Sequence, residues 1–353
     1  MLAILLSGCV ERRATLPARN PDEDKARINR SLPAKLSDRE GWTDDIYSAF
    51  AQLGIEPSPP NTCAVAAVIA QESSFAVNPV IPNLGAIASH EIDRRAEHVY
   101  IPLSVVHGVL GWQSPDGRSW RERIDAARTE KDLSDVYEAF IAGVPMGRTL
   151  FENRNPVRTR GPMQVNVAFA EQFADTHKYP YPLSGTLGDE LFTRRGSIYF
   201  GVAHLLAYRA PYDSYLYRFA DYNAGQFSSR NAAFQRAVAI ASHRPLTADG
   251  ALLPHEASNG DTELLIRTLS SRLSVTDTDI RAALSKGRTE DFEGTALYRR
   301  IFSLAEEAGG QSLPRAVVPN IELTGPKLHR QLTTAWYAQR VDDRFQRCLQ
   351  TNH

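Results

Sequence analysis

The stretch NTCAVAAVIAQESSF, residues 61–75, decides the fold of this chain, because it predicts a helix that is apolar on nearly every side. Asn61 follows Ser58-Pro59-Pro60 and is a good N-cap residue. Thr62 to Ser74 contains neither Gly nor Pro, so about three turns of helix fit. We therefore expect a buried helix that carries Glu72 near its end.

Glu72 is placed on an apolar face of that helix. Helical offsets of three, four and seven residues lead back from Glu72 to Ile69, Val68 and Val65. Burial disfavours an ionised carboxylate and raises its pKa, which suits a general acid that works near neutral pH. The alternative is an ordinary glutamate that emerges at a helix end.

Three motifs decide between these interpretations. Residues 71–79 contain Gln-Glu-Ser-Ser-Phe followed by Asn-Pro, residues 161–166 read Gly-Pro-Met-Gln-Val-Asn, and residues 221–225 read Asp-Tyr-Asn-Ala-Gly. In this order they resemble the Glu-Ser, Gly-Leu-Met-Gln and Ala-Tyr-Asn-Ala-Gly motifs of the soluble-type lytic transglycosylases, in the lysozyme-like superfamily. Residues 195–220 resemble the long helix that precedes the last motif. The likeness covers roughly residues 61–79 and 158–240.

The resemblance implies a role for each matching residue. Glu72 would be the acid and then the base, and the hydroxyl of Tyr222 would orient it. Met163 and Gln164 would contact N-acetyl sugars, while Asn223 and Gly225 would shape a turn. Ser73, Gly161 and Asn223 complete the expected substrate-binding set. For Met163 and Tyr222, burial in the core is the alternative.

The family's reaction would need only one carboxylate and no metal or cofactor. Glu72 would protonate the β-1,4 oxygen between N-acetylmuramic acid and N-acetylglucosamine, and then take a proton from the C6 hydroxyl as that hydroxyl attacks C1. A hydrolytic muramidase, with Asp221, Glu91 or Asp93 positioning water, is one alternative. A catalytically silent lipoprotein that binds glycan or scaffolds a cell-wall machine is the other.

The chain departs from the family pattern in three places. Pro162 stands where the family has Leu, and Asp221 where it has Ala. The third departure is an insertion at about residues 80–158, which separates Glu72 from Gly161. Helical patterns at 101–110 and 120–141 predict a helical accessory subdomain.

The N-terminus resembles a bacterial lipoprotein signal. Residues 1–9 are an apolar run that ends Leu-Ser-Gly-Cys9, although no basic residue precedes it. We expect cleavage before Cys9, acylation of Cys9, and, since Val10 follows, anchoring in the outer membrane facing the periplasm. Residues 10–30 are polar, contain two prolines, and predict a tether.

With Cys9 acylated, Cys63 and Cys348 remain as a pair. A disulfide is permitted in an oxidising compartment, and we predict one that ties the C-terminal segment to the Glu72 helix. Two buried free thiols are the alternative.

The composition is that of a folded globular protein. The net charge of −1 favours neither nucleic acid nor anionic lipid as a partner. The resemblance implies glycan strands of peptidoglycan as the partner, and the lipid anchor at Cys9 is the expected membrane contact. The apolar spacing predicts a mainly α fold. The resemblance implies a lysozyme-like catalytic domain at 31–240, and we expect additional C-terminal helices at 241–353 to pack on it. Trp336 and Tyr337 could form a platform on which glycan rings stack, but we expect both side chains to be buried in the core.

Overall fold

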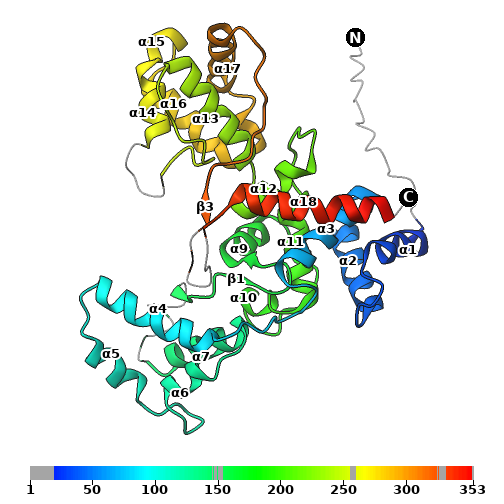
Figure 1. Ribbon diagram of the computed structural model, residues 1–353, viewed down its shortest axis with the longest axis vertical. Coiled ribbons are helices and arrows are strands. Elements are labelled where there is room, and N and C mark those ends of the chain that lie inside the picture. Colours follow the sequence, from blue (N-terminus) through cyan, green and yellow to red (C-terminus); the bar gives the residue numbers. More distant parts are fainter. Residues whose placement is uncertain are drawn as a thin grey trace, which may run out of the picture.

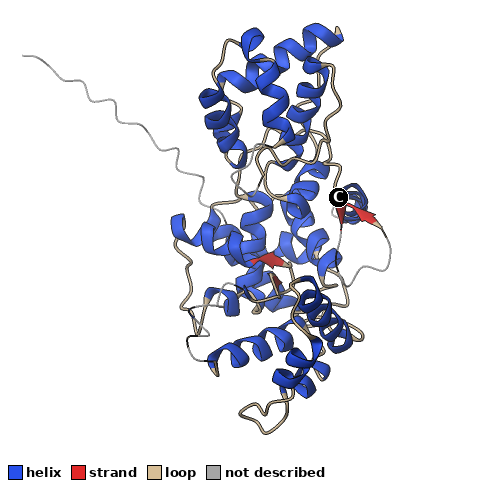
Figure 2. Ribbon diagram, turned by 90° about the vertical axis from the view of Figure 1, so that its left-hand side faces the viewer, coloured by secondary structure: helices blue, strands red, loops and turns tan. Residues whose placement is uncertain are grey.

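The chain is mainly helical, as predicted. A computed structural model describes residues 20–144, 146, 149, 154–254, 260–323, 325 and 331–351. Most of the described residues lie in helices (Figure 2). The described strands form two short antiparallel pairs, β1 (Thr159–Arg160) with β2 (Val165–Asn166) and β3 (Glu322–Leu323) with β4 (Leu332–Thr333). None of the described helices is both long and apolar enough to cross a membrane.

The central body is built around the helix predicted to carry Glu72. This helix, α3 (Pro59–Glu72), begins two residues before the expected N-cap, because Ser58 caps it and Pro59 fits the first helical position. Its residues from Thr62 to Ile69 are all buried. The helices α2 (Arg39–Leu53), α11 (Arg194–Leu206), α12 (Tyr215–Ala224) and α18 (Thr334–Thr351) share one hydrophobic core with it.

The prediction that residues 10–30 form a tether is wrong for the second half of this segment. Residues 21–31 form helix α1 (Pro21–Ser31), which Asn20 caps and which Pro21 begins. Ile28 and Leu32 are buried in the central core, so this segment belongs to the folded body.

The insertion is helical and has a small core of its own. It contains α4 (Leu84–His98), α5 (Leu103–Leu110), α6 (Trp120–Asp125) and α7 (Glu130–Ala142), which lie together at the bottom of Figure 1. The helix expected at 120–141 is interrupted, because Ser119 and Thr129 each form a capping box that starts a new helix. Trp120, Ile124 and Val136 pack together in this core.

Between the insertion and the second half of the chain lie α9 (Val167–Thr176) and α10 (Leu187–Glu190). The single long helix expected at 195–220 is instead two helices, α11 and α12. Residues 207–214 separate them, and this segment contains Pro211 and ends with Ser214, which caps α12.

The C-terminal residues 241–353 do not form one extension. A second core begins earlier, at α13 (Ser228–Ser242), and includes α14 (Asp261–Thr268), α15 (Ser270–Leu273), α16 (Asp277–Leu284) and α17 (Ala296–Gly309). The short 3-10 turns Ser285–Arg288 and Glu290–Phe292 join α16 to α17. This second core, called the upper body below, lies at the top of Figure 1. The chain then leaves it, and the last helix, α18, packs against α3 and α12 of the central body.

Candidate functional site

Glu72 is the last residue of α3, where the buried helix meets a tight turn. Ser73 ends the helix, and Ser74 and Phe75 both have positive φ, at 51° and 65°. Phe75 then packs edge-on against Trp42, with ring centroids 5.2 Å apart. The chain therefore turns sharply at Glu72, which stays partly exposed although the middle of its helix, from Thr62 to Ile69, is buried.

The surroundings of Glu72 favour its protonated form. Its pKa is raised to about 7, first because burial removes water from the carboxylate. A hydrogen bond from Tyr337 opposes this shift, and the negative charge of Glu130 adds to it. Near neutral pH the carboxyl group is thus poised between its two protonation states, as a general acid requires.

The hydrogen bond that orients Glu72 comes from Tyr337, not from Tyr222. The Tyr337 hydroxyl donates to Oε1 of Glu72. The Tyr222 hydroxyl donates instead to the carbonyl of Met163, at 2.7 Å. The negative charge of Glu72 nevertheless contributes, after burial, to the raised pKa of Tyr222. The helical pattern of α18 predicted the burial of Tyr337, but no sequence signal pointed to its partner.

The Gly161–Gln164 turn has the tight backbone that the second motif predicts. Gly161 has a φ of +72°, and a Cβ there would lie 2.0 Å from the carbonyl oxygen of Leu191. Met163 is completely buried and its side chain lies against Gly201, so the expected sugar contact is wrong and the core alternative is right. Close packing around the turn excludes a ligand from this side chain.

Gln164 is partly exposed and links the turn to the insertion. Its Nε2 donates to Oε2 of Glu130 at 2.9 Å, while Thr159 donates to its Oε1 at 2.9 Å. Glu130 was not predicted as a site residue, because it lies in the insertion that the family pattern lacks. Gln164 remains a candidate for substrate contact, with its amide already held in place.

Two further predicted site residues, Ser73 and Asn223, make hydrogen bonds within the fold. Ser73 is buried and donates to the carbonyl of Ile69 at 3.1 Å within its own helix. Asn223 accepts a hydrogen bond from Thr334, at 2.7 Å, and so ties α12 to the start of α18. Gly225, with a φ of +106°, ends α12 in the turn that the third motif predicts.

A stack of rings lies behind Tyr222. The ring of His204 in α11 is 4.8 Å from that of Tyr222 and 4.4 Å from that of Phe169 in α9. Burial lowers the pKa of His204 to about 4, so the imidazole is neutral at physiological pH. The stack supports Tyr222 from the side of α11 without adding a charge near Glu72.

Asp221 is not available to position water. It is fully buried and accepts hydrogen bonds from the hydroxyls of Tyr208 and Tyr212 and from the backbone N–H groups of Phe227 and Ser229. Two of these donors begin α13, so the carboxylate stabilises a helix N-terminus. Burial raises the pKa of Asp221, and the hydrogen bonds from Ser229, Tyr212 and Tyr208 oppose the shift.

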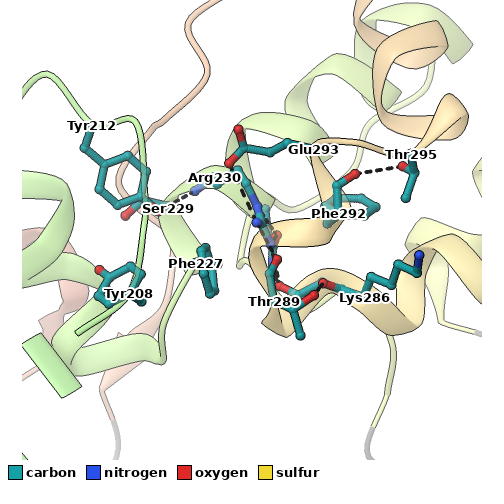
Figure 3. A network of polar contacts seen from close by, with 12 residues as sticks. Tyr208, Tyr212, Phe227, Ser229, Arg230, Lys286, Thr289, Phe292, Glu293 and Thr295 are labelled. Atoms are coloured by element: carbon teal, nitrogen blue, oxygen red, sulfur yellow. Dashed lines mark hydrogen bonds and ion pairs between the residues drawn. The ribbon is translucent and has the colours of Figure 1, made fainter. Parts of the chain in front are cut away.

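The same region joins the central body to the upper one (Figure 3). Tyr212 accepts from the backbone of Arg230, whose buried guanidinium donates to the carbonyls of Gly287 and Thr289 at 2.7 and 2.8 Å. An ion pair with Glu293, at 3.7 Å, completes the junction. The extra carboxylate of the third motif is therefore structural.

The other two acidic candidates are engaged within the insertion. Glu91 pairs with Arg94 and Arg95, which lower its pKa to about 2. Asp93 lies 2.9 Å from Nε2 of His107. Both carboxylates are held by partners in α4 and α5, and nothing in their geometry directs them at Glu72.

The predicted disulfide is confirmed, since Cys63 of α3 is bonded to Cys348 of α18. The predicted acylation site Cys9 and the signal at 1–9 lie outside the described residues. Within the described ranges, no group of three or more His, Cys, Asp or Glu side chains is arranged to hold a metal ion.

Comparison with known proteins places most of the folded part in one family. The profile of the family described as "Protein of unknown function (DUF1615)" matches residues 35–351. A relative from Escherichia coli (strain K12), described as "Uncharacterized protein YaiW", is 47% identical over 354 residues, which cover 99% of this chain and 96% of the relative. No solved structure matches the chain. The family match includes Glu72, the insertion and α18.

Proposed function

Since the chain belongs to the DUF1615 family of proteins of unknown function, we propose its activity from the Glu72 site. The proposal is a peptidoglycan lytic transglycosylase, with a lysozyme-like catalytic core, that cleaves the β-1,4 bond between N-acetylmuramic acid and N-acetylglucosamine. The observation that carries it is the carboxyl group of a partly exposed residue at the end of a buried helix, with a pKa of about 7 and a tyrosine hydroxyl holding it. The order of the three motifs supports the same assignment.

The reaction uses one carboxyl group twice, first as an acid and then as a base. Protonated Glu72 gives its proton to the glycosidic oxygen as the bond from that oxygen to C1 of the muramoyl residue breaks. The resulting carboxylate then takes the proton of the C6 hydroxyl, whose oxygen bonds to C1 and closes a 1,6-anhydro ring. No water is consumed, and Glu72 ends in its starting form.

Tyr337 would act as a positioning residue in this scheme. A hydrogen bond to Glu72 limits the directions in which the carboxyl group points, and orientation contributes much of the rate in proton transfer. The same bond stabilises the ionised form that exists between the two proton transfers. Gln164, fixed by Thr159 and Glu130, is proposed to contact the sugar beside Glu72.

The test is digestion of purified sacculi followed by mass spectrometry of the products. Wild-type protein is expected to release 1,6-anhydromuramoyl ends, and Glu72→Gln to release none. Glu97→Gln, which changes an exposed glutamate of α4, is the matched control and should retain activity. Reducing ends would instead indicate a hydrolytic muramidase. Binding to sacculi without any cleavage would indicate a silent glycan-binding protein.

We also propose that Cys9 is acylated and anchors the protein in the outer membrane, facing the periplasm. The support is the lipobox-like sequence at residues 6–9, and the confirmed disulfide fits an oxidising compartment. Labelling of cells with a fatty-acid analogue is expected to mark the wild-type protein but not Cys9→Ala. Labelling of both forms to the same extent would exclude Cys9 as the attachment site.

A further inference from the structure

We infer that the protein touches a lipid surface with one exposed side of the insertion. This side is formed by the turn before α5 and by the outer side of α5, and its residues are Val99, Tyr100, Ile101, Val105 and Trp112. We call these five residues the membrane-contact face. The inference goes beyond cleavage at Glu72, and it rests on the proposed attachment to the membrane through Cys9.

The side chains of the membrane-contact face are large and apolar, and all five are exposed to solvent. The exposed fraction is 93% for Tyr100, 64% for Trp112 and 45–59% for the other three. Soluble proteins commonly expose such side chains singly, whereas several of them together mark a contact with a partner or a lipid. The group therefore indicates that something covers this side of the insertion.

The exposed residues of α5 lie on one side of the helix. Val105, Gly108 and Trp112 follow one another at helical offsets of three and four residues. Trp112 continues this side, because the residue that joins it to the helix keeps helical backbone angles, with a φ of −77° and a ψ of −13°. The opposite side of α5 carries Val106 and Leu110, which pack in the small core of the insertion. One side of α5 is thus held by the protein and the other is left uncovered.

The membrane-contact face lies in a segment without formal charge. No Asp, Glu, Lys or Arg stands between Glu97 and Asp116, although helices normally carry charged side chains on the side that faces water. The ring of His107 in this segment is paired with Asp93 of α4, at 2.9 Å. An uncharged surface can leave water without the large cost of desolvating a charge. The chemistry of the segment therefore suits contact with lipid.

The position and the aromatic residues of this face favour a bilayer over a protein groove. Helix α5 lies on the outer edge of the insertion, at the lower left of Figure 1. Tyr100 and Trp112 are the residue types that gather where a bilayer meets water, with the ring among the lipids and the polar group towards water. The eight residues of α5 are far fewer than the ~20 that cross a bilayer, so the helix would lie in the plane of the surface.

The length of chain before the folded body brings a bilayer within reach. Residues 10–19 separate Cys9 from Asn20, where the described part of the chain begins. Even fully extended, this segment spans at most about 35 Å. An acyl group on Cys9 therefore keeps the body close to the lipid, and a contact that is weak for a free protein is favoured by the high local concentration.

Trp112 itself reports the contact through its fluorescence. Trp42 and Trp120 are buried, Trp336 is partly buried, and residues 1–19 contain no tryptophan. Phospholipids with bromine atoms on their acyl chains quench a tryptophan only when its ring reaches those chains. Quenching of Trp112 therefore separates contact through the membrane-contact face from attachment through the N-terminus alone.

The experiment holds every variant at the lipid surface in the same way. The full chain carries a histidine tag before residue 1, and phosphatidylcholine vesicles with a nickel-chelating lipid bind this tag whether or not Cys9 is acylated. With brominated phosphatidylcholine, the emission of the wild-type protein should fall and its maximum should shift to shorter wavelength. Trp112→Phe should abolish both effects. High salt should leave them unchanged, because the face is uncharged.

Two substitutions test the face against a matched control. Val105→Asp places a charge on it and should abolish the quenching while the protein stays on the vesicles. Leu264→Asp is the control, because Leu264 is an exposed apolar residue of α14 in the upper body, 47% exposed against 55% for Val105, and the quenching should persist. Where Val105→Asp does not fold, Tyr100→Ser should weaken the quenching. Wild-type quenching in a folded Val105→Asp or Tyr100→Ser protein would overturn the inference.

Two other results would also reject the membrane-contact face. An unquenched Trp112 in the wild-type protein held on the vesicles would show that this face does not reach the lipid. A dimer in solution that Val105→Asp converts into a monomer would assign the face to a second copy of the chain. Neither result bears on Glu72 or on Cys9, because sacculus digestion and fatty-acid labelling test those proposals separately.

Discussion

The hydroxyl of Tyr337 donates a hydrogen bond to the carboxylate of Glu72, and these two residues are 265 positions apart in the chain. Tyr337 lies in the first turns of α18 and Glu72 at the end of α3. The other ends of the same two helices are joined by the Cys63–Cys348 disulfide. The last helix of the chain is therefore clamped at both ends to the helix that carries the candidate acid.

Tyr337→Phe should raise the pKa of Glu72 above 7, because the lost hydrogen bond favours the ionised carboxylate. We expect cleavage of sacculi to fall about tenfold, which corresponds to the loss of one hydrogen bond in the transition state. The alkaline limb of the pH profile should move to higher pH. Tyr215→Phe is the control, since it removes a bond between Tyr215 and Asn61 without touching Glu72. Equal pH profiles for the two variants would contradict a positioning role.

Tyr222→Phe should mainly lower stability. It leaves the buried carbonyl of Met163 without its 2.7 Å donor, which costs about 1–2 kcal/mol in the free energy of unfolding. Urea denaturation measures this loss. If Tyr222→Phe instead shifted the Glu72 titration as far as Tyr337→Phe does, Tyr222 would be the orienting residue that the motif resemblance implies.

Replacing Cys63 and Cys348 together with Ser should lower stability by about 2–5 kcal/mol, since the disulfide closes a loop across 285 positions. Because α18 carries Tyr337, activity should fall together with stability. Thermal unfolding with and without a reductant measures the effect. The reductant should destabilise the wild-type protein and have no effect on the double variant.

Gly161→Ala should destabilise the protein by about 3 kcal/mol or more. The substitution combines an unfavourable positive φ with a Cβ 2.0 Å from the Leu191 carbonyl oxygen. Gly54→Ala separates the two causes, because Gly54 has a φ of +65° and open space around it. It should cost only about 1 kcal/mol. Equal losses in the two variants would show that the close contact relaxes.

Glu72→Gln should be more stable than the wild type above pH 7. Below about pH 4.5, Glu72 is protonated in both the folded and the unfolded protein, so its titration makes no difference. As the pH rises towards 7 the unfolded protein releases this proton first, which favours unfolding by up to roughly 3 kcal/mol. Urea denaturation of both forms between pH 4 and 8 measures the growing difference. A constant difference across this range would show that burial does not raise the Glu72 pKa.

Much of the fold was predictable because its signals are local. The apolar run before Glu72, the helical patterns of the insertion and the amphipathic pattern of α18 each determine a helix through neighbouring residues. Errors arose where one residue decides a boundary. Ser214 starts a new helix inside the expected long one, and Pro21 starts a helix inside the expected tether.

The candidate site was predictable only in part, because its partners come from distant segments. The sequence by itself determined a carboxyl group at the end of a buried helix, a glycine turn at 161 and a pair of cysteines fit to bond. Only the tertiary structure decided which of the 13 tyrosines reaches Glu72, that Met163 is core, and that Glu130 accepts a hydrogen bond from Gln164. The physical reason is that local periodicity sets which face of a helix is buried, whereas long-range packing sets what that face meets.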